Sequence, residues 1–224
     1  MDFALTEEQQ MLYDTARAFC DKELIPHEQH LEKTNELPRE MEMEVRQKAM
    51  EIGLHACNFP ENMGGAGLDC VSFTLVEKGL SRASLALAEC VRRPNNILEA
   101  CEGNQISHFR DPVLRGEKRE CVAMTEPDAG SDLKGMKTTA RRDGDNWIIN
   151  GTKHFISNAR ISDFVILFAA TGEDETDKGP RKRISCFLVD LDAPGVEVAP
   201  GYDHMGHRGY YNDILRFDNA RVGN

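Results

Sequence analysis

The interpretation of the fold depends on one stretch of sequence, Met124-Thr125-Glu126-Pro127-Asp128-Ala129-Gly130-Ser131-Asp132, which directly follows a predicted strand. Pro127 fixes one backbone dihedral, and Gly130 permits conformations that are closed to other residues. The hydroxyls of Thr125 and Ser131, together with backbone amides, offer hydrogen bonds of both polarities. Such a loop could hold a polar heterocycle or a phosphate. Composition alone favours a simple connecting turn with self-capping Asp and Ser, and both interpretations stay open at this point.

The pattern of the sequence changes shortly before this loop, near Gly116. Up to that point apolar residues recur at helical spacing, as in the stripe Met41, Val45, Ala49 and Ile52. After it, short runs rich in Val, Ile, Phe and Thr alternate with turn residues. The sequence therefore predicts an α+β protein, with an all-α domain over residues 1–118 and an antiparallel β-barrel or sandwich domain over residues 119–224.

Capping residues predict where the helices begin. Thr6-Glu7-Glu8-Gln9 forms a capping box, which predicts a first helix reaching about Leu24. Its apolar face is expected to hold Met11, Leu12, Phe19 and Cys20. Pro38 suits the first turn of a second helix, which Gly53 ends. Further helices are expected around Phe73 to Leu80, from Leu85 to Arg93 and from Gln105 to Leu114.

The second half is expected to hold seven short strands. These are Glu120 to Thr125, Met136 to Arg142, Asn146 to Ile149, His154 to Ser157, Asp163 to Ala170, Ile184 to Val189 and Ile214 to Phe217. Asn150-Gly151 is expected to form a turn between two of them. The charged stretch from Thr171 to Arg183 is expected to be a solvated loop.

Composition and charge exclude several classes of function. Lys plus Arg number 27 against 38 Asp plus Glu, a net charge of -11, and this balance argues against nucleic-acid binding. The longest apolar run, Phe164 to Ala170, is far shorter than the roughly 18 residues of a spanning helix, so no membrane span is expected. The first eight residues resemble neither a secretory signal nor a transit peptide.

The seven cysteines are scattered and none forms a C-x-x-C pair. This pattern predicts buried thiols in a reducing compartment, and we expect a cytoplasmic protein. The cysteines are Cys20, Cys57, Cys70, Cys90, Cys101, Cys121 and Cys186.

Common metal and nucleotide motifs are missing from the sequence. His27 and His30 lack the H-E-x-x-H arrangement and a third ligand, and His204 and His207 have no nearby cysteine or carboxylate cluster. No metal site is therefore predicted. There is also no G-x-S-x-G elbow, no G-x-x-x-x-G-K-[ST] loop and no G-x-G-x-x-G after a strand.

Residue by residue, the loop 124–132 resembles the flavin-binding signature of the acyl-CoA dehydrogenase family, which is close to T-E-P-x-A-G-S-D. The segment 147–158 is similar to a second flavin segment of that family, N-G-x-K-x-[WF]-I-[ST]-N. Further matches fall in the family's order along nearly the whole chain: Leu5-Thr6-Glu7-Glu8-Gln9, Pro60-Glu61-x-x-Gly64-Gly65-x-Gly67, Gly103-Asn104, Gly116-Glu117, Pro194-Gly195-Val196 and Met205-Gly206-x-Arg208.

The resemblance implies an FAD site. It implies that residues 122–131 wrap the flavin ring, with the backbone of Met124 and Thr125 and the Thr125 hydroxyl at the ring edge. Gly130 and Ser131 would lie beside the FAD phosphates, and Ser131 also beside the bound thioester chain. Phe155 stands where the family usually has Trp, so it keeps the aromatic face and lacks the indole donor. The full set of implied cofactor residues is Val122, Ala123, Met124, Thr125, Gly130, Ser131, Phe155, Ile156 and Ser157.

The resemblance also implies a reaction, the α,β-dehydrogenation of an acyl-CoA thioester, with electron-transfer flavoprotein or a similar acceptor as partner. In the family a glutamate base comes from a carboxy-terminal helical bundle, which has no matching position among these 224 residues. We therefore assign no catalytic residue, and Glu126 and Asp132 are expected to shape the loop. The chain is expected to be a truncated or two-domain form that is inactive alone, acting as a homo-oligomer or with a complementing helical chain.

Two alternatives remain open from the sequence. The first is a non-catalytic interaction module that keeps the same scaffold. The second is a relative of the acyl-CoA oxidases or flavin monooxygenases, which share the scaffold and consume oxygen.

Overall fold

A computed structural model describes residues 4–177 and 179–223, and residues 1–3 of the amino-terminal stretch discussed above lie outside this range. The chain divides into two compact units. One holds Met1–Glu117 and His204–Tyr210, and the other holds Lys118–Asp203 and Tyr211–Asn224. The boundary lies one residue before the position predicted from the sequence. The seven residues 204–210, which were placed in the β domain, group with the helical unit instead.

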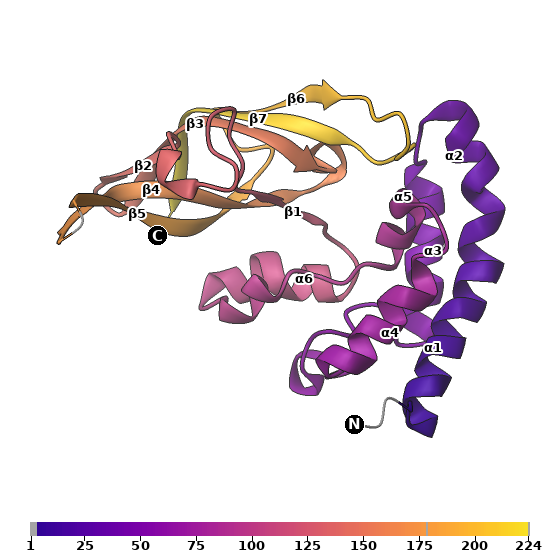
Figure 1. The fold of residues 1–224 in the computed structure, drawn as a ribbon. Helices are drawn as coiled ribbons and strands as arrows, with labels where there is room; N and C mark the ends of the chain where they lie inside the picture. The colour runs from indigo at the N-terminus through magenta and orange to yellow at the C-terminus, as the bar shows by residue number, and fades with distance from the viewer. Residues whose placement is uncertain (1–3, 178, 224) are drawn as a thin grey trace. The chain divides into compact units, whose positions relative to one another are not determined.

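The first unit is helical, as predicted (Figure 1). Its α-helices are α1 (Glu7–Phe19), α2 (Glu28–Thr34), α3 (Arg39–Glu51), α4 (Cys70–Leu80), α5 (Leu85–Ala88) and α6 (Asp111–Leu114). A π-helical turn, Cys20–Leu24, extends α1, and another, Ile106–Arg110, precedes α6. The helices predicted from Leu85 and from Gln105 are thus shorter or less regular than expected.

The predicted capping box begins α1. The amide of Gln9 donates to the Thr6 hydroxyl at 3.2 Å, and the amide of Thr6 donates back to the Gln9 side chain at 3.1 Å. The predicted apolar face is wrong at Met11, whose side chain is 69% exposed. Ala16, which belongs to the buried face, contacts α4 at Gly79, where an added Cβ would lie 2.7 Å from the Ala16 Cβ.

Helix α3 buries an ion pair that its apolar stripe did not predict. The side chains of Glu42 and Arg46 are each 1% exposed and form a salt bridge one helical turn apart. Arg46 also donates to the carbonyl of Gly116 at 2.9 Å. Ile52, the last residue of the predicted stripe, is 48% exposed.

The segment 204–210 is held within the helical unit by a turn residue after α2. Asn35 adopts a positive φ of 57° and its side-chain oxygen accepts a hydrogen bond from the amide of Gly209 at 3.0 Å. Gly209 itself has φ of 74°, and an added Cβ would lie 2.8 Å from the Leu31 side chain. Only glycine therefore fits this position without strain.

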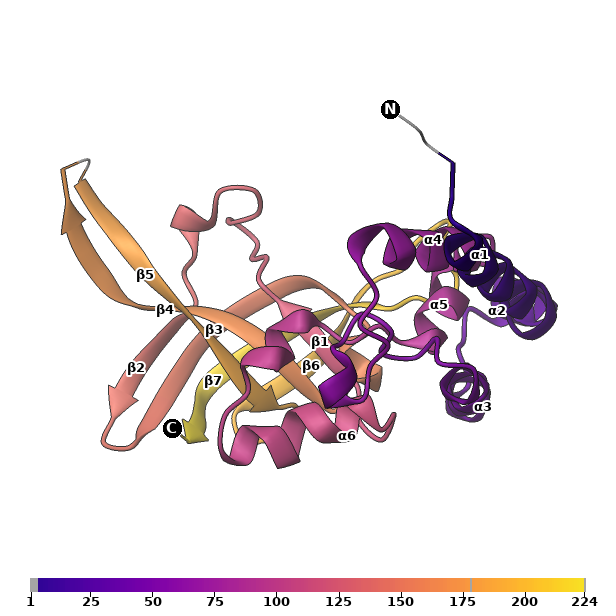
Figure 2. The ribbon, with the colours of Figure 1, turned by 90° about the horizontal axis from the view of Figure 1, so that it is seen from below.

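The second unit is one curled sheet of seven strands (Figures 1 and 2). The strands are β1 (Glu120–Ala123), β2 (Thr139–Asp143), β3 (Asn146–Ser157), β4 (Phe164–Thr176), β5 (Gly179–Asp190), β6 (Val196–Tyr202) and β7 (Asn212–Gly223). Their order is β1-β4-β2-β3-β7-β6, with β5 paired to β4. The prediction of helices followed by a β domain is confirmed, although β1 and β2 both pair with β4 in parallel.

Three local predictions in the β unit are wrong. The stretch from Thr171 to Arg183 is not a solvated loop, because β4 and β5 pair through it as far as Thr176 and Gly179. In Figure 2 this long hairpin is labelled β4 and β5. The Asn150-Gly151 pair lies inside β3 rather than in a turn, opposite an irregularity where β7 has one extra residue, so two predicted strands are one. Strand β6 was not predicted at all.

The core of the β unit is built from the inward-facing residues of most of its strands. It includes Ala123 of β1, Ile156 of β3 and Leu167 of β4, none of which is more than 1% exposed. Within residues 4–177 and 179–223, no helix has the length and apolar character needed to cross a membrane.

Candidate functional site

The signature loop begins where β1 ends and is closed by a short internal bridge. The amide of Glu126 donates to the carbonyl of Ala129 at 2.8 Å, and the amide of Ala129 donates back to the carbonyl of Glu126 at 3.3 Å. Ala129 is buried while Gly130 and Ser131 are exposed. The loop therefore has a fixed base and an open end.

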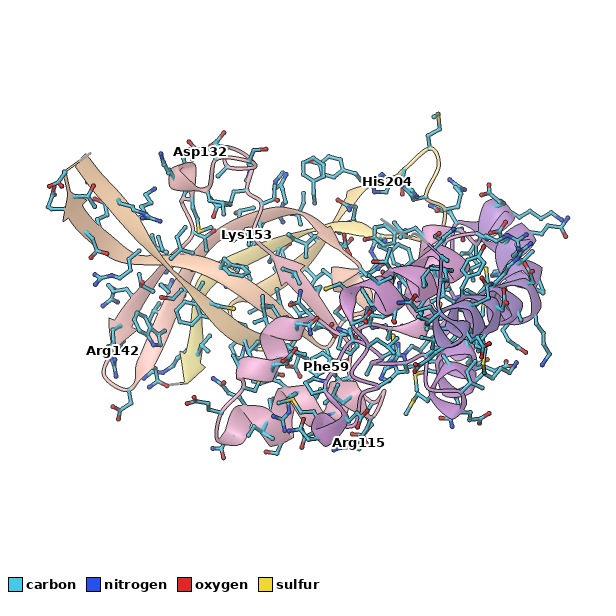
Figure 3. The ribbon with its side chains drawn as sticks, turned by 60° about the horizontal axis from the view of Figure 1, so that its bottom comes forward. Phe59, Arg115, Asp132, Arg142, Lys153 and His204 are labelled. Carbon is cyan, nitrogen blue, oxygen red and sulfur yellow. The ribbon has the colours of Figure 1, made fainter. Side chains whose placement is uncertain are left out.

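A buried ion pair lies beneath the loop. Lys153 of β3 places its ammonium nitrogen 2.9 Å from Oε1 of Glu126, and the two side chains are 0% and 3% exposed. The same nitrogen donates to the carbonyl oxygen of Met124 at 2.9 Å. Figure 3 labels Lys153 on the sheet and Asp132 on the loop. One side chain of the sheet thus binds the loop at two points.

Glu126 also receives two backbone amides from the segment that returns to β2. Lys137 donates to Oε2 at 2.6 Å and Thr138 donates to Oε1 at 3.0 Å. Burial by itself would raise the pKa of Glu126, but the hydrogen bonds from Thr138, Lys137 and Lys153 outweigh it and lower the pKa. Burial lowers the pKa of Lys153, an effect that Glu126 opposes. The prediction that Glu126 shapes the loop is consistent with this network.

A bulge in β3 directs a backbone amide to the loop. Lys153 pairs with Leu215 of β7, and Ile156 pairs with Asp213. Between these two pairs, two residues of β3 face a single residue of β7. The amide of His154, in this bulge, donates to the carbonyl of Thr125 at 2.9 Å. Consecutive carbonyls of the loop, those of residues 124 and 125, are therefore both held by β3.

These hydrogen bonds fix the direction of the Thr125 amide. In a planar trans peptide the N–H points opposite to the preceding C=O. Because the carbonyl of Met124 faces Lys153, the amide of Thr125 points away from Lys153. This donor, the Thr125 hydroxyl and the exposed amides near Gly130 form a set of polar groups along one short stretch of backbone.

Phe155 occupies the same bulge with an unusual backbone conformation. Its φ is +57° and its side chain is 53% exposed. The ring stacks on that of Tyr202 in β6, with centroids 4.7 Å apart and an interplanar angle of 23°. A left-handed conformation costs a non-glycine residue about 1–2 kcal/mol, and an aromatic pair contributes about 0.5–1.5 kcal/mol. The stack therefore offsets much of the strain.

The residues predicted from the signatures are not equally accessible. Val122 and Phe155 are exposed, at 36% and 53%, while Ala123 and Ile156 lie in the core at 0% and 1%. The last two can therefore offer only their backbone to a ligand. The half-buried residues of the set are Met124, Thr125 and Ser157, and its fully exposed loop residues are Gly130 and Ser131. Hydrogen bonds between β3 and the loop bring the two signatures together.

Three residues that the sequence analysis did not assign to the site lie within it. They are Lys153, His154 and Tyr202. The lysine of the second flavin segment, N-G-x-K-x-[WF]-I-[ST]-N, was a signal for Lys153. No local pattern could have identified Tyr202, because it lies on an unpredicted strand 47 positions after Phe155 in the printed sequence.

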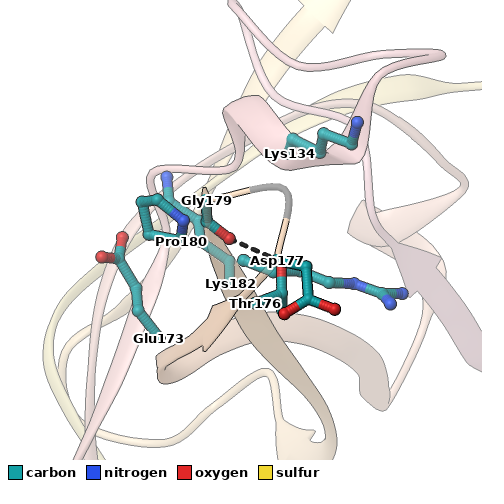
Figure 4. Close-up of a pocket in the computed structure, with 8 residues that line it drawn as sticks. Lys134, Glu173, Thr176, Asp177, Gly179, Pro180 and Lys182 are labelled. Carbon is teal, nitrogen blue, oxygen red and sulfur yellow. Dashed lines mark hydrogen bonds between the residues drawn. The ribbon is translucent and has the colours of Figure 1, made fainter.

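Two cavities of the β unit do not include the predicted site. A cavity of about 590 Å³ lies at the end of the β4–β5 hairpin, lined in part by Lys134, Glu173, Asp177 and Lys182 (Figure 4). Another, of about 520 Å³, is lined in part by Arg160 and Asp190. None of the nine residues predicted to hold a cofactor lines either cavity.

The thiols divide into two groups. Five cysteines are buried, as expected, whereas Cys70 and Cys186 are exposed, so the prediction of a buried thiol is wrong for these two. Burial raises the pKa of the Cys57 thiol to about 11. Among the described residues no group of three or more His, Cys, Asp or Glu side chains is arranged to hold a metal ion.

Two family models match the chain and together span most of it. Residues 6–111 match the model described as acyl-CoA dehydrogenase, N-terminal domain. Residues 121–220 match the model described as acyl-CoA dehydrogenase, middle domain. The two matches follow the helical and β parts of the chain.

Individual proteins show the same likeness. The probable acyl-CoA dehydrogenase YngJ of Bacillus subtilis is 35% identical over 228 residues, covering 99% of this chain and 58% of YngJ. A crystal structure of a putative acyl-CoA dehydrogenase from Mycobacterium smegmatis is 32% identical with a TM-score of 0.83, covering 98% of this chain and 57% of the other.

A third likeness is to a structure with a bound flavin. Glutaryl-CoA dehydrogenase from Mycobacterium smegmatis in complex with FADH2 is 27% identical with a TM-score of 0.80, covering 98% of this chain and 54% of the other. The chain spans about half the length of the curated relatives it matches.

Proposed function

Because this chain belongs to the acyl-CoA dehydrogenase family and matches its N-terminal and middle domains, we propose that its β unit forms one wall of an FAD site. The observation that carries the proposal is the arrangement of Thr125 and Phe155. A backbone amide directed away from Lys153 and an exposed aromatic ring are held on the same short network of β3 and the loop. A polar donor beside an apolar flat face suits the edge and face of a flavin ring.

Each residue of the wall has a distinct role in this proposal. The backbone of Met124 and Thr125 and the Thr125 hydroxyl bind the polar edge of the ring, and Phe155 contacts its face. Gly130 and Ser131 lie beside the phosphates, where exposed amides favour negative charge. The remaining residues line the ring through side chain or backbone: Val122, Ala123, Ile156 and Ser157.

The proposed reaction is the α,β-dehydrogenation of an acyl-CoA thioester, with Ser131 also contacting the thioester chain. When bound, FAD supplies the acceptor for the hydride that leaves the β-carbon. The residues of this chain align the ring and exclude water from one side of it. The proton next to the thioester carbonyl needs a carboxylate base, and we assign that base to no residue of this chain.

We further propose an electron-transfer flavoprotein or similar acceptor as the redox partner, and a complementing helical chain or a second copy to complete the site. The seven thiols suit a reducing compartment, and we place the protein in the cytoplasm.

The test is a titration of FAD with the 224-residue chain, followed by flavin fluorescence. We expect weak but saturable binding that the substitution Phe155→Ala weakens at least fivefold, while Tyr13→Ala in α1 leaves it unchanged. With an acyl-CoA added, flavin bleaching should be negligible without a helical partner. Rapid turnover by the chain alone would contradict the proposal. A chain that folds yet binds no FAD, even with a helical partner supplied, would favour the interaction module.

A further inference from the structure

Phe155 and Tyr202 contact each other across a strand that separates them. Both β3 and β6 pair with β7, on its two sides. In a flat sheet two strands on either side of a third lie about 10 Å apart, but some residues of β3 and β6 have Cα atoms within 8 Å of each other. The two rings nevertheless stack with centroids 4.7 Å apart. The two side chains therefore bridge the strands that flank β7.

Paired bulges in the flanking strands accompany this contact. In β3 the residues His154 and Phe155 together face one residue of β7. In β6 the residues Pro200 and Gly201 together face one residue of β7. They lie between Ala199 and Tyr202, which both pair with β7. Bulges re-aim side chains and increase local twist. The two bulges lie opposite neighbouring residues of β7, immediately beside the stacked rings.

The tyrosine is itself anchored to the loop network. Its hydroxyl lies within hydrogen-bond distance of Nδ1 of His154, at 3.1 Å. The amide of the same histidine donates to the carbonyl of Thr125. Phenylalanine has no polar atom with which to fix its own orientation, and this ring is 53% exposed. The only described aromatic ring stacked on it with a near-parallel plane is that of Tyr202.

We propose that Tyr202 is a positioning residue, which holds the Phe155 ring in the orientation that a planar ligand requires. The inference rests on the proposed flavin site and assigns a role to a residue outside both signatures. Tyr202 orients Phe155 by stacking on it. The hydrogen bond between Tyr202 and His154 fixes the position of the two rings relative to the Thr125 backbone. A phenylalanine at position 155 can thus contact a planar ligand without the N–H donor of an indole.

A double-mutant cycle on FAD affinity tests the role. We expect Tyr202→Ala to weaken FAD binding about fivefold, no more than Phe155→Ala does, and Tyr202→Phe, which keeps the stack, by no more than twofold. If Tyr202 acts through Phe155, the double variant Phe155→Ala/Tyr202→Ala should bind FAD no more weakly than Phe155→Ala alone. Additive losses, or normal binding by Tyr202→Ala, would overturn the proposal. The matched control is Tyr13→Ala, the same chemical change in the helical unit.

A second cycle needs no cofactor. The urea midpoints of the same variants should be non-additive, because each single substitution already removes the ring contact. Additive midpoints would show that the rings are not coupled and would overturn the inference by themselves. If the wild-type chain binds no FAD even with a helical partner supplied, the proposed function is wrong, and the urea cycle still decides whether Tyr202 holds the ring.

Discussion

The ammonium nitrogen of Lys153 lies 2.9 Å from a carboxylate oxygen of Glu126, with both side chains almost completely buried. This pair joins the two sequence signatures, because Glu126 belongs to the loop and Lys153 to β3. The carboxylate retains the amides of Lys137 and Thr138 as further donors. The pair is therefore a structural connection between the segments that the flavin proposal requires to lie together.

The first prediction concerns the loss of one partner. Lys153→Met leaves Glu126 buried without its cation, and removing one member of a buried pair costs about 3–5 kcal/mol. We expect Lys153→Met to lower the unfolding free energy by an amount near the lower end of this range, since two amides still bind the carboxylate. The double variant Glu126→Gln/Lys153→Met should be more stable than Lys153→Met. Urea unfolding measures both, and Lys137→Met, which breaks the exposed pair with Asp128, should cost less than about 1 kcal/mol.

The second prediction concerns pH. The pKa of Glu126 is lowered from its ordinary value of 4.5, so the unfolded chain binds this proton more readily than the folded chain. The carboxylate's contribution to stability is then complete above about pH 4.5 and is lost as the pH falls through the lowered pKa. The difference in unfolding free energy between wild type and Glu126→Gln should be constant at neutral pH and shrink in acid. A difference that grows as the pH falls below 4.5 would contradict the assignment.

The third prediction concerns the approach of α1 to α4. An added Cβ at Gly79 would lie 2.7 Å from the Ala16 Cβ and 2.9 Å from the Arg17 nitrogen. Overpacking costs about 1–3 kcal/mol, against a gain of about 1 kcal/mol in helix propensity. We therefore expect Gly79→Ala to lower the unfolding free energy by up to about 2 kcal/mol. Gly206→Ala, where no atom lies within 4 Å of an added Cβ, should change it by less than about 0.5 kcal/mol.

The fourth prediction concerns the thiols. In the native chain an alkylating reagent should modify Cys70 and Cys186, which are exposed, before any other cysteine. Cys57 should stay unmodified, because it is buried and its pKa is raised to about 11. Peptide mass spectrometry after partial alkylation identifies the sites. Early modification of Cys57 would show that the helical unit opens more readily than its burial indicates.

The parts of the fold that could be predicted from the sequence are those determined by local pattern. The capping box at Thr6 begins α1 as expected, and the change in periodicity near Gly116 marks the start of the β unit. The charged stretch after Thr171 was wrongly predicted, because its polarity indicated a loop while pairing between β4 and β5 extends it as strand. A two-stranded ribbon with both faces in water needs no apolar alternation.

The candidate site was predictable only in part for a related reason. The signatures identify the loop and the aromatic residue at position 155, but a motif does not say which side chains face the core. Ala123 and Ile156 carry the motif and point inward, whereas Tyr202 lies outside every motif and touches Phe155. That contact depends on two bulges in strands that flank a third, a long-range arrangement that single-sequence periodicity cannot report.

The grouping of residues 204–210 with the helices affects the order in which the protein can mature on the ribosome. The unit whose last helix ends at Leu114 lacks its final segment until Tyr210 has been synthesised, about 95 residues later. At about 5–20 residues per second, translation leaves Asn35 without its Gly209 partner for roughly 9 to 35 s. The amino-terminal helices are therefore made first and completed almost last, after most of the β strands have been translated.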